Sequence, residues 1–526
     1  ARPRVALLRR RLVDITSVST KPGQVQTRTY EDDFRMTSLQ VNSEVSIPFG
    51  YDDDGLLMHA GHLAMTRDPG NGILLGSTLV DGDDVIEGAF THNSFGEIQS
   101  YTTEFNNSEI YSSSIGSRDK LGRITERTET ITIAPGPPQS TTRNFRYDSA
   151  GRLWKVCADG PCSSILSEYL YDQNGNRNDG FVGADAISAI YDDQDRLLSN
   201  TRGSVTHLYT YNENGDLASK AHTGANAITT YSHDAFGNLR SVTLPDETTI
   251  DYLIDGRSRR IGKKVNGTVV QRFVYKDQLN PVAEIDGDGA VVAQFIYASK
   301  PNVPDYMIKG GRTYGVASDH LGSVKLLIDI ADGSVAQHID YDEFGQVTID
   351  TNPGFQPFGF AGGIYDRDTG LMHFGARDYD PSVGRWIAKD AIGFAGKDTN
   401  FYGYVQSDPI NFIDPTGFQR APGYNYCGAG NNPDSEPVND LDRACQEHDE
   451  CYGRDGMSAN DVTGQRGQGN DDCPQDRCDD KLCDAAREFS PETRYDSLVT
   501  EIVDRMFCDP SAPLPPSPQT LSLPYF

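Results

Sequence analysis

The first 417 residues repeat a short pattern in which apolar and polar residues alternate on either side of a turn. Five clear copies begin at Tyr147, Tyr171, Tyr191, Tyr211 and His233, at intervals of about 20 residues. Each copy has an aromatic residue, an Asp or Asn, a polar turn that usually contains Gly, and then aliphatic residues. Alternation at period two is typical of half-buried strands, and the Asp and Gly residues favour tight turns. The pattern therefore predicts a succession of antiparallel hairpins.

Weaker copies of the pattern extend the repeat in both directions. They begin at His92, Arg118, Ile254 and Tyr341. A single hairpin is marginally stable in water, whereas hairpins paired edge to edge bury a continuous face and cover one another's edges. The expected structure is mainly β, with one long sheet.

Charge and hydropathy exclude two classes of function. The chain has 526 residues with 47 basic and 76 acidic side chains, a net charge of −29. Such a charge disfavours binding to nucleic acid, and no apolar run approaches the roughly 18 residues that a membrane-spanning helix needs. Because the chain starts without Met, we expect it to be the cut end of a longer polypeptide.

The cysteines divide the chain into two parts. Cys157 and Cys162 lie in the body, where they either bridge a turn or stay reduced, and the other seven cysteines follow residue 417. A short, acidic, cysteine-dense segment is typical of a disulfide-stabilised module in an oxidising compartment. Residues 511–526 are rich in Pro and Ser, which favours an extended or disordered tail.

Three motifs near the end of the body are more specific than the repeat. They read DHLGSVKLLID from Asp319, GLMHFGARDYDPSVGRWIAKD from Gly370 and NFYGYVQSDPINFIDPTGF from Asn400. With these motifs the body resembles the RHS/YD-repeat family. The resemblance implies a hollow, spiralling β-shell over residues 1–369 and a core motif with an autoproteolysis region over residues 370–417.

Many bacterial members of that family are toxins that cleave themselves after the final DPxG, which here predicts a break between Gly417 and Phe418. Peptide hydrolysis by carboxylates needs one protonated and one ionised partner, since two adjacent negative charges do not persist. The residues that match the family motif are Arg377, Asp378, Asp390 and Asp414. The family commonly has Asp-Pro where this chain has Asp390-Ala391, and the alternative role of these aspartates is in turns and caps.

The cysteine-rich segment contains a set of residues with helical spacing. Cys445, His448, Asp449 and Tyr452 recur at i, i+3, i+4 and i+7, and Gly453 is a plausible helix end. These four side chains therefore share one helix face, and residues 478–489 can form a second helix against it. A His beside an Asp and between two cysteines indicates a catalytic site far more strongly than a lone His.

This segment resembles secreted phospholipase A2. The calcium loop of that family is matched by residues 426–430, its active helix by residues 442–452, and the CDDK of its insect-venom branch by residues 478–481. The resemblance implies a small α-helical, disulfide-rich domain over residues 418–510. It also implies hydrolysis of the sn-2 ester of a glycerophospholipid.

The resemblance assigns roles residue by residue. It implies Ca²⁺ bound by the carbonyls of Tyr426, Gly428 and Gly430 and by the Asp449 carboxylate, an all-oxygen set suited to a hard cation. It also implies that His448 is the general base, that Asp479 orients His448, that Tyr452 orients Asp479, and that the Gly428 N–H stabilises the oxyanion.

The family pattern also implies disulfides. It pairs Cys427 with Cys445, Cys451 with Cys478, and Cys473 with Cys508, and it leaves Cys483 without an assigned partner. Ala444 and Ala485 replace both cysteines of one family bridge, which favours an intact module over a decayed one.

Together these features favour a toxin whose shell encloses a calcium-dependent phospholipase A2 effector. Its expected partners are the phospholipid membrane of a target cell, an immunity protein and a secretion system that delivers it, with no nucleic acid. We expect a protein that is secreted or delivered into a target cell and is not an integral membrane protein. The alternatives are a teneurin-like surface or adhesion protein with a non-catalytic lipid-binding tail, and an inert β-scaffold with a disulfide-rich plug.

Overall fold

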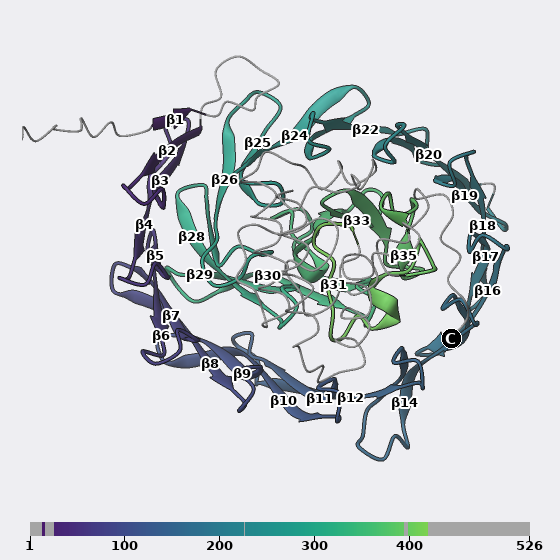
Figure 1. The fold of residues 1–526 in the computed structure, drawn as a ribbon, viewed down its shortest axis with the longest axis horizontal. Helices are drawn as coiled ribbons and strands as arrows, with labels where there is room; N and C mark the ends of the chain where they lie inside the picture. Colours follow the sequence, from purple (N-terminus) through teal and green to yellow (C-terminus); the bar gives the residue numbers. More distant parts are fainter. Residues whose placement is uncertain (1–12, 16–25, 226, 394–397, 419–526) are drawn as a thin grey trace, which may run out of the picture. The chain divides into compact units, whose positions relative to one another are not determined.

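Thirty-one strands form one long sheet in which each strand pairs antiparallel with the next along the chain (Figure 1). The structure, a computed structural model, describes residues 13–15, 26–225, 227–393 and 398–418. A second sheet of four strands follows the first. The prediction of a mainly β chain with one long sheet is confirmed for the described residues.

The first half of the long sheet comprises β1 (Val13–Ile15), β2 (Gln26–Tyr30), β3 (Met36–Val41), β4 (Ile47–Tyr51), β5 (Leu57–Ala60), β6 (Leu63–Arg67), β7 (Leu74–Asp81), β8 (Asp84–His92), β9 (Ile98–Phe105), β10 (Ser108–Arg118), β11 (Ile124–Ile131), β12 (Gln139–Tyr147), β13 (Leu153–Cys157), β14 (Ile165–Tyr171), β15 (Arg177–Val182) and β16 (Asp185–Tyr191). The second half comprises β17 (Leu197–Arg202), β18 (Val205–Tyr211), β19 (Leu217–His222), β20 (Ala227–His233), β21 (Leu239–Thr243), β22 (Thr249–Ile254), β23 (Arg260–Val265), β24 (Thr268–Tyr275), β25 (Pro281–Ile285), β26 (Val291–Ile296), β27 (Tyr306–Lys309), β28 (Arg312–Ser318), β29 (Val324–Asp329), β30 (Val335–Tyr341) and β31 (Val347–Asp350). The small sheet comprises β32 (Ile364–Asp366), β33 (Leu371–Phe374), β34 (Arg377–Asp380) and β35 (Arg385–Trp386), with short 3₁₀ turns at Phe360–Gly362 and Val405–Ser407.

Each repeat of the sequence pattern forms one hairpin turn closed by its Asp. In the copy that begins at Tyr147, the Asp148 N–H donates to the Arg152 carbonyl at 2.9 Å. The Asp148 carboxylate accepts from the backbone N–H groups of Ala150 at 2.9 Å and Arg152 at 3.0 Å. Gly151 takes φ +91°, the left-handed region that glycine enters without strain. The Asp and Gly of the repeat are therefore explained by one turn geometry.

The basic and aromatic positions of the repeat join neighbouring units. The Arg152 side chain donates from Nε to the Asp148 carboxylate at 2.7 Å and lies over the Tyr171 ring, 4.7 Å from its centroid. The Tyr171 hydroxyl in turn donates to the Leu153 carbonyl at 2.7 Å. The same Arg-on-Tyr stacking recurs at Arg35/Tyr51, Arg123/Tyr147, Arg196/Tyr211 and Arg259/Tyr275. The interval between copies thus corresponds to the step from one stacked Arg and Tyr to the next.

The small sheet packs against one face of the long sheet. Leu371, Val383 and Ile387 belong to the same buried cluster as residues of β16 to β22, among them Tyr209 and Leu217. Polar contacts reinforce this packing, since Lys220 Nζ donates to Asp380 at 3.0 Å and the Tyr402 hydroxyl donates to the Gly215 carbonyl at 2.6 Å. The core motif is therefore held by β19 and the turn before it, which precede it by about 160 to 190 residues.

The chain divides into two compact units. The first comprises residues 1–389 and 402–417, and the second comprises residues 390–401 and 418–526. Cys157 and Cys162 form a disulfide, which decides between the two states that the sequence left open. The expected α-helical domain lies outside the described residues. Within those residues, no helix is both long and apolar enough to cross a membrane.

Candidate self-cleavage site

The segment that ends at Gly417 lies against the hairpin between β33 and β34. The Ala376 N–H donates to the Thr416 carbonyl at 2.9 Å, and the Gly417 N–H donates to the Asp414 carbonyl at 3.3 Å. Gly417 takes φ +66°, and a Cβ at this position would lie 2.4 Å from the Phe374 carbonyl oxygen. A side chain at Gly417 would therefore push the segment off the hairpin.

Arg377 holds this segment by its charge. Its side chain is 3% exposed, and its Nε donates a hydrogen bond to the Gly417 carbonyl oxygen. Its Nη2 lies 3.4 Å from the Asp414 carboxylate, which also accepts from the Thr416 hydroxyl at 3.0 Å. The guanidinium stacks on the Trp386 ring, 4.2 Å from its centroid, which fixes its plane. A buried cation on a carbonyl oxygen makes the attached carbon more electrophilic and stabilises an oxyanion formed there.

Asp378, the neighbour of Arg377, is a buried carboxylate paired with a different arginine. Arg260 Nη2 donates to both of its oxygens, at 2.7 and 2.9 Å, and His373 Nδ1 lies 3.3 Å from one of them. Burial alone would raise the pKa of Asp378, but Arg260 and then His373 lower it to about 2. Burial and the nearby Arg260 lower the pKa of His373. Asp378 is therefore ionised at neutral pH.

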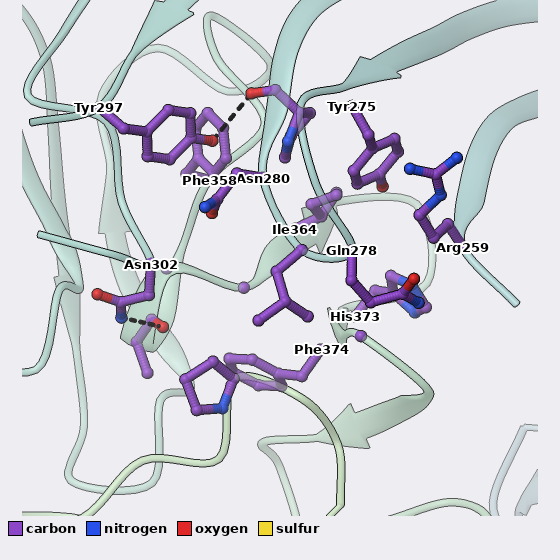
Figure 2. A pocket seen from close by; sticks show the side chains of 17 residues that line it. Arg259, Tyr275, Gln278, Asn280, Tyr297, Asn302, Phe358, Ile364, His373 and Phe374 are labelled. Atoms are coloured by element: carbon purple, nitrogen blue, oxygen red, sulfur yellow. Dashed lines mark hydrogen bonds between the residues drawn. The ribbon is translucent and has the colours of Figure 1, made fainter. Parts of the chain in front are cut away.

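A small cavity adjoins this hairpin (Figure 2). Its volume is about 30 Å³, and its walls include His373, Phe374 and Pro415 together with Tyr297 and Asn302 from the long sheet and its loops. The Tyr297 hydroxyl is engaged with the Pro281 carbonyl at 2.9 Å, shown as a dashed line. A cavity of this size holds about one water molecule, which is too little room for a lipid chain.

Asp390 belongs to the second compact unit. Its side chain is buried. Its N–H donates to the Phe401 carbonyl at 3.0 Å, and its carboxylate accepts from the Ile392 N–H at 3.0 Å. These contacts form a turn, and the catalytic role stays a prediction.

The structure thus brings together Arg377, Asp414 and Gly417, three of the residues singled out in the sequence. Asp378, the next residue of β34, is paired with Arg260 instead. Sequence reasoning missed Arg260, His373, Thr416 and Trp386. The last three lie within the sequence motifs, so the motifs themselves were a signal that could have identified them. Arg260 lies 118 residues before Asp378, and no local pattern links the two.

The predicted phospholipase residues lie outside the described residues. They are Tyr426, Gly428, Gly430, His448, Asp449, Tyr452 and Asp479, with the cysteines Cys427, Cys445, Cys451, Cys473, Cys478, Cys483 and Cys508. In the described ranges, no group of three or more His, Cys, Asp or Glu side chains is arranged to hold a metal ion. The expected calcium site stays a prediction.

Two family models match the chain. Residues 15–410 match the teneurin YD-shell, and residues 418–459 match the phospholipase A2-like domain. The two matches do not overlap, and the second begins directly after Gly417.

Individual relatives are similar over the shell. Teneurin-3 of Danio rerio is 30% identical over 75% of this chain and 14% of its own length. The tRNA3(Ser)-specific nuclease WapA of Bacillus spizizenii is 28% identical over 51% of this chain and 11% of its own length. The crystal structure of TcdB2-TccC3 matches with a TM-score of 0.33 and 16% identity, over 75% of this chain and 27% of that one. This chain therefore spans only a minor part of each relative's length.

Proposed function

We propose that this chain, which belongs to the teneurin YD-shell family, is a secreted toxin whose shell encloses a calcium-dependent phospholipase A2 effector. The observation that carries the proposal is the phospholipase A2-like match, which begins at residue 418. The effector would be separated from the shell by self-cleavage between Gly417 and Phe418. Its substrate would be the sn-2 ester of a membrane glycerophospholipid.

The proposed cleavage is a hydrolysis. Arg377 polarises the Gly417 carbonyl, and a water molecule adds to its carbon. Asp378, ionised at neutral pH, takes a proton from that water and passes it to the departing nitrogen. The C–N bond then breaks, which leaves a carboxylate at Gly417 and an amine at Phe418.

The proposed lipid hydrolysis rests on the residue match in the tail. His448 takes a proton from the attacking water, Asp479 holds the ring of His448, and Tyr452 orients Asp479. The carbonyls of Tyr426, Gly428 and Gly430 and the Asp449 carboxylate offer oxygen donors of the kind that Ca²⁺ prefers. Bound Ca²⁺ would supply positive charge at the ester oxygen.

Containment by the shell would protect the producing cell. A module of about 109 residues is roughly 30 Å across, small enough for a cavity walled by a sheet of about 400 residues. An immunity protein and a delivery system would complete the assembly. The competing proposal, a teneurin-like surface protein with a non-catalytic lipid-binding tail, is favoured by the share of the chain that matches teneurins.

Fatty-acid release from phosphatidylcholine liposomes separates the two proposals. We expect the protein, once cleaved and opened with mild denaturant, to release fatty acid in CaCl₂ and to stop releasing it in excess EDTA. Binding to liposomes without release would favour the adhesion protein, and neither binding nor release would favour an inert scaffold. The matched control is His448→Ala, which should bind calcium and release nothing.

A further inference from the structure

The last segment of the shell is anchored close to the predicted cut. The Asn411 side chain donates from Nδ2 to the Tyr147 hydroxyl at 2.8 Å and accepts from the Ile124 N–H at 2.8 Å. These two contacts tie the segment to β11 and β12. Residues 412–417, six in number, separate Asn411 from the cut. Cleavage after Gly417 would leave this anchor intact, because the anchor lies entirely on the shell side of the broken bond.

The contacts that seat the end of the segment also lie on the shell side of the broken bond. The Ala376 N–H donates to the Thr416 carbonyl at 2.9 Å, and Arg377 donates from Nε to the Gly417 carbonyl oxygen. Both donors belong to the hairpin between β33 and β34, and the Arg377 side chain is 3% exposed. The acceptors are carbonyl oxygens of Thr416 and Gly417, which remain with the shell. Hydrolysis therefore removes neither bond.

Hydrolysis changes the charge of the group that Arg377 holds. When the C–N bond breaks, the Gly417 carbonyl becomes a carboxylate, and the nitrogen of Phe418 leaves with a proton. A hydrogen bond from a guanidinium to a carboxylate is roughly twice as strong as one between neutral groups. Nη2 of Arg377 already lies 3.4 Å from the Asp414 carboxylate, and a guanidinium has donors enough for both anions. Repulsion between the two carboxylates offsets part of the gain.

The anchor keeps the cut end near this site. Six residues reach at most about 21 Å, and a flexible tether of this length gives an effective concentration in the millimolar range. At about 1 mM, a site with a dissociation constant of about 0.1 mM for the free peptide would be about 90% occupied by its own end. A junction from another molecule, at micromolar concentration, would compete poorly.

We propose that the Arg377 site is also a product site, which holds the C-terminal carboxylate that cleavage creates at Gly417. The proposal rests on the self-cleavage proposed above. The ligand is the shell's own end, a glycine carboxylate preceded by Thr416, and the groups that hold it are the Arg377 guanidinium and the Ala376 N–H. Because the cut end then fills the site, each molecule cuts itself once and does not act on a second chain.

Carboxypeptidase digestion of wild-type protein that has cut itself tests the proposal. The mass of the native shell fragment should stay unchanged, whereas the fragment in urea should lose Gly417 and Thr416. Arg377→Lys, left until it is fully cut, should lose these two residues from the native fragment at least about tenfold faster than wild type, since lysine keeps the charge but not the fixed direction of the donor. The control Arg240→Ala should resist digestion like wild type.

Hydrogen exchange at Ala376 gives a second readout, because this N–H donates to Thr416 only while the end is seated. An end that is about 90% bound should slow exchange at Ala376 about tenfold relative to fully cut Arg377→Lys. Equal exchange in the two cut proteins would overturn the role of Arg377. A native wild-type fragment that loses Gly417 as fast as the unfolded one would overturn the product site alone. A wild-type chain that stays whole would overturn self-cleavage itself, and the product site with it.

Discussion

Arg377 donates a hydrogen bond from Nε to the carbonyl oxygen of Gly417, the residue that precedes the predicted break. The bond is buried, and the arginine plane is fixed by Trp386 beneath it. A cation held in this way polarises the carbonyl of that peptide. The shell therefore carries a group at its last residue that can assist cleavage of the following bond.

The first prediction concerns this contact. Arg377→Lys should slow the appearance of cleaved fragments by about 10²-fold, because lysine keeps the charge but loses the fixed direction of the donor. Pulse-chase expression followed by a denaturing gel measures the rate. Arg240→Ala, which removes a half-exposed arginine elsewhere on the sheet, should cleave at the wild-type rate. Equal rates for Arg377→Lys and wild type would remove Arg377 from the mechanism.

The second prediction compares two glycines with similar backbones. Gly417 and Gly267 both have positive φ, at +66° and +78°. A Cβ at Gly417 would meet the Phe374 carbonyl at 2.4 Å, whereas at Gly267 it would meet nothing within 4 Å. Gly267→Ala should cost only about 1 kcal/mol of unfolding free energy, from backbone strain alone. Gly417→Ala should abolish most cleavage, because its Cβ would displace the segment from the hairpin. Normal cleavage in Gly417→Ala would show that the observed position of the segment is not needed.

The third prediction concerns pH and Asp408, which fastens the core motif to β11 and β12. Its carboxylate accepts from Asn411 Nδ2 at 2.8 and 3.0 Å, and the same nitrogen donates to the Tyr147 hydroxyl at 2.8 Å. Burial raises the pKa of Asp408 to about 7. The folded protein therefore keeps a proton that the unfolded chain loses above about pH 4.

This raised pKa gives stability that is fully present below about pH 4 and is lost as the pH rises to about 7. Asp408→Asn should remove that loss. Relative to wild type, its free energy of unfolding should therefore rise by at most about 4 kcal/mol between pH 4 and 7. Urea unfolding at half-unit pH steps measures the difference. Asp193→Asn, in an exposed turn, is the control and should follow wild type at every pH. A difference in unfolding free energy between Asp408→Asn and wild type that stays constant with pH would contradict the raised pKa.

The fold was largely predictable from the sequence because its determinants are local. The Asp, Gly, Arg and Tyr of each repeat contact one another within a turn or in the next repeat, so spacing alone reveals them. The site was only partly predictable. Arg377 and Gly417 stand in motifs, but the pairing of Asp378 with Arg260 joins segments 118 residues apart.

The fourth prediction concerns the lipid chemistry. His448→Ala should abolish fatty-acid release and keep calcium binding, since this side chain is not a proposed ligand. Asp449→Ala should lose both, because it removes the only charged ligand and site affinity rises with ligand charge. Calorimetric titration with CaCl₂ beside the release assay separates the two variants. Asp479→Asn should bind calcium but release fatty acid more slowly by some orders of magnitude. The reason is that His448 would lose the carboxylate that fixes its tautomer, as in catalytic triads. Full activity in His448→Ala would end the phospholipase proposal.

The central claim is that the shell ends, and cuts itself, at Gly417. Intact mass and N-terminal sequencing of purified protein test it most directly. The account predicts fragments of about 46 kDa and about 12 kDa by proportion of length, the smaller one beginning at Phe418. Asp378→Asn and Asp390→Asn should each give one full-length chain, with Asp193→Asn cut like wild type. A wild-type chain that stays whole, or a fragment that begins at another residue, would contradict the account.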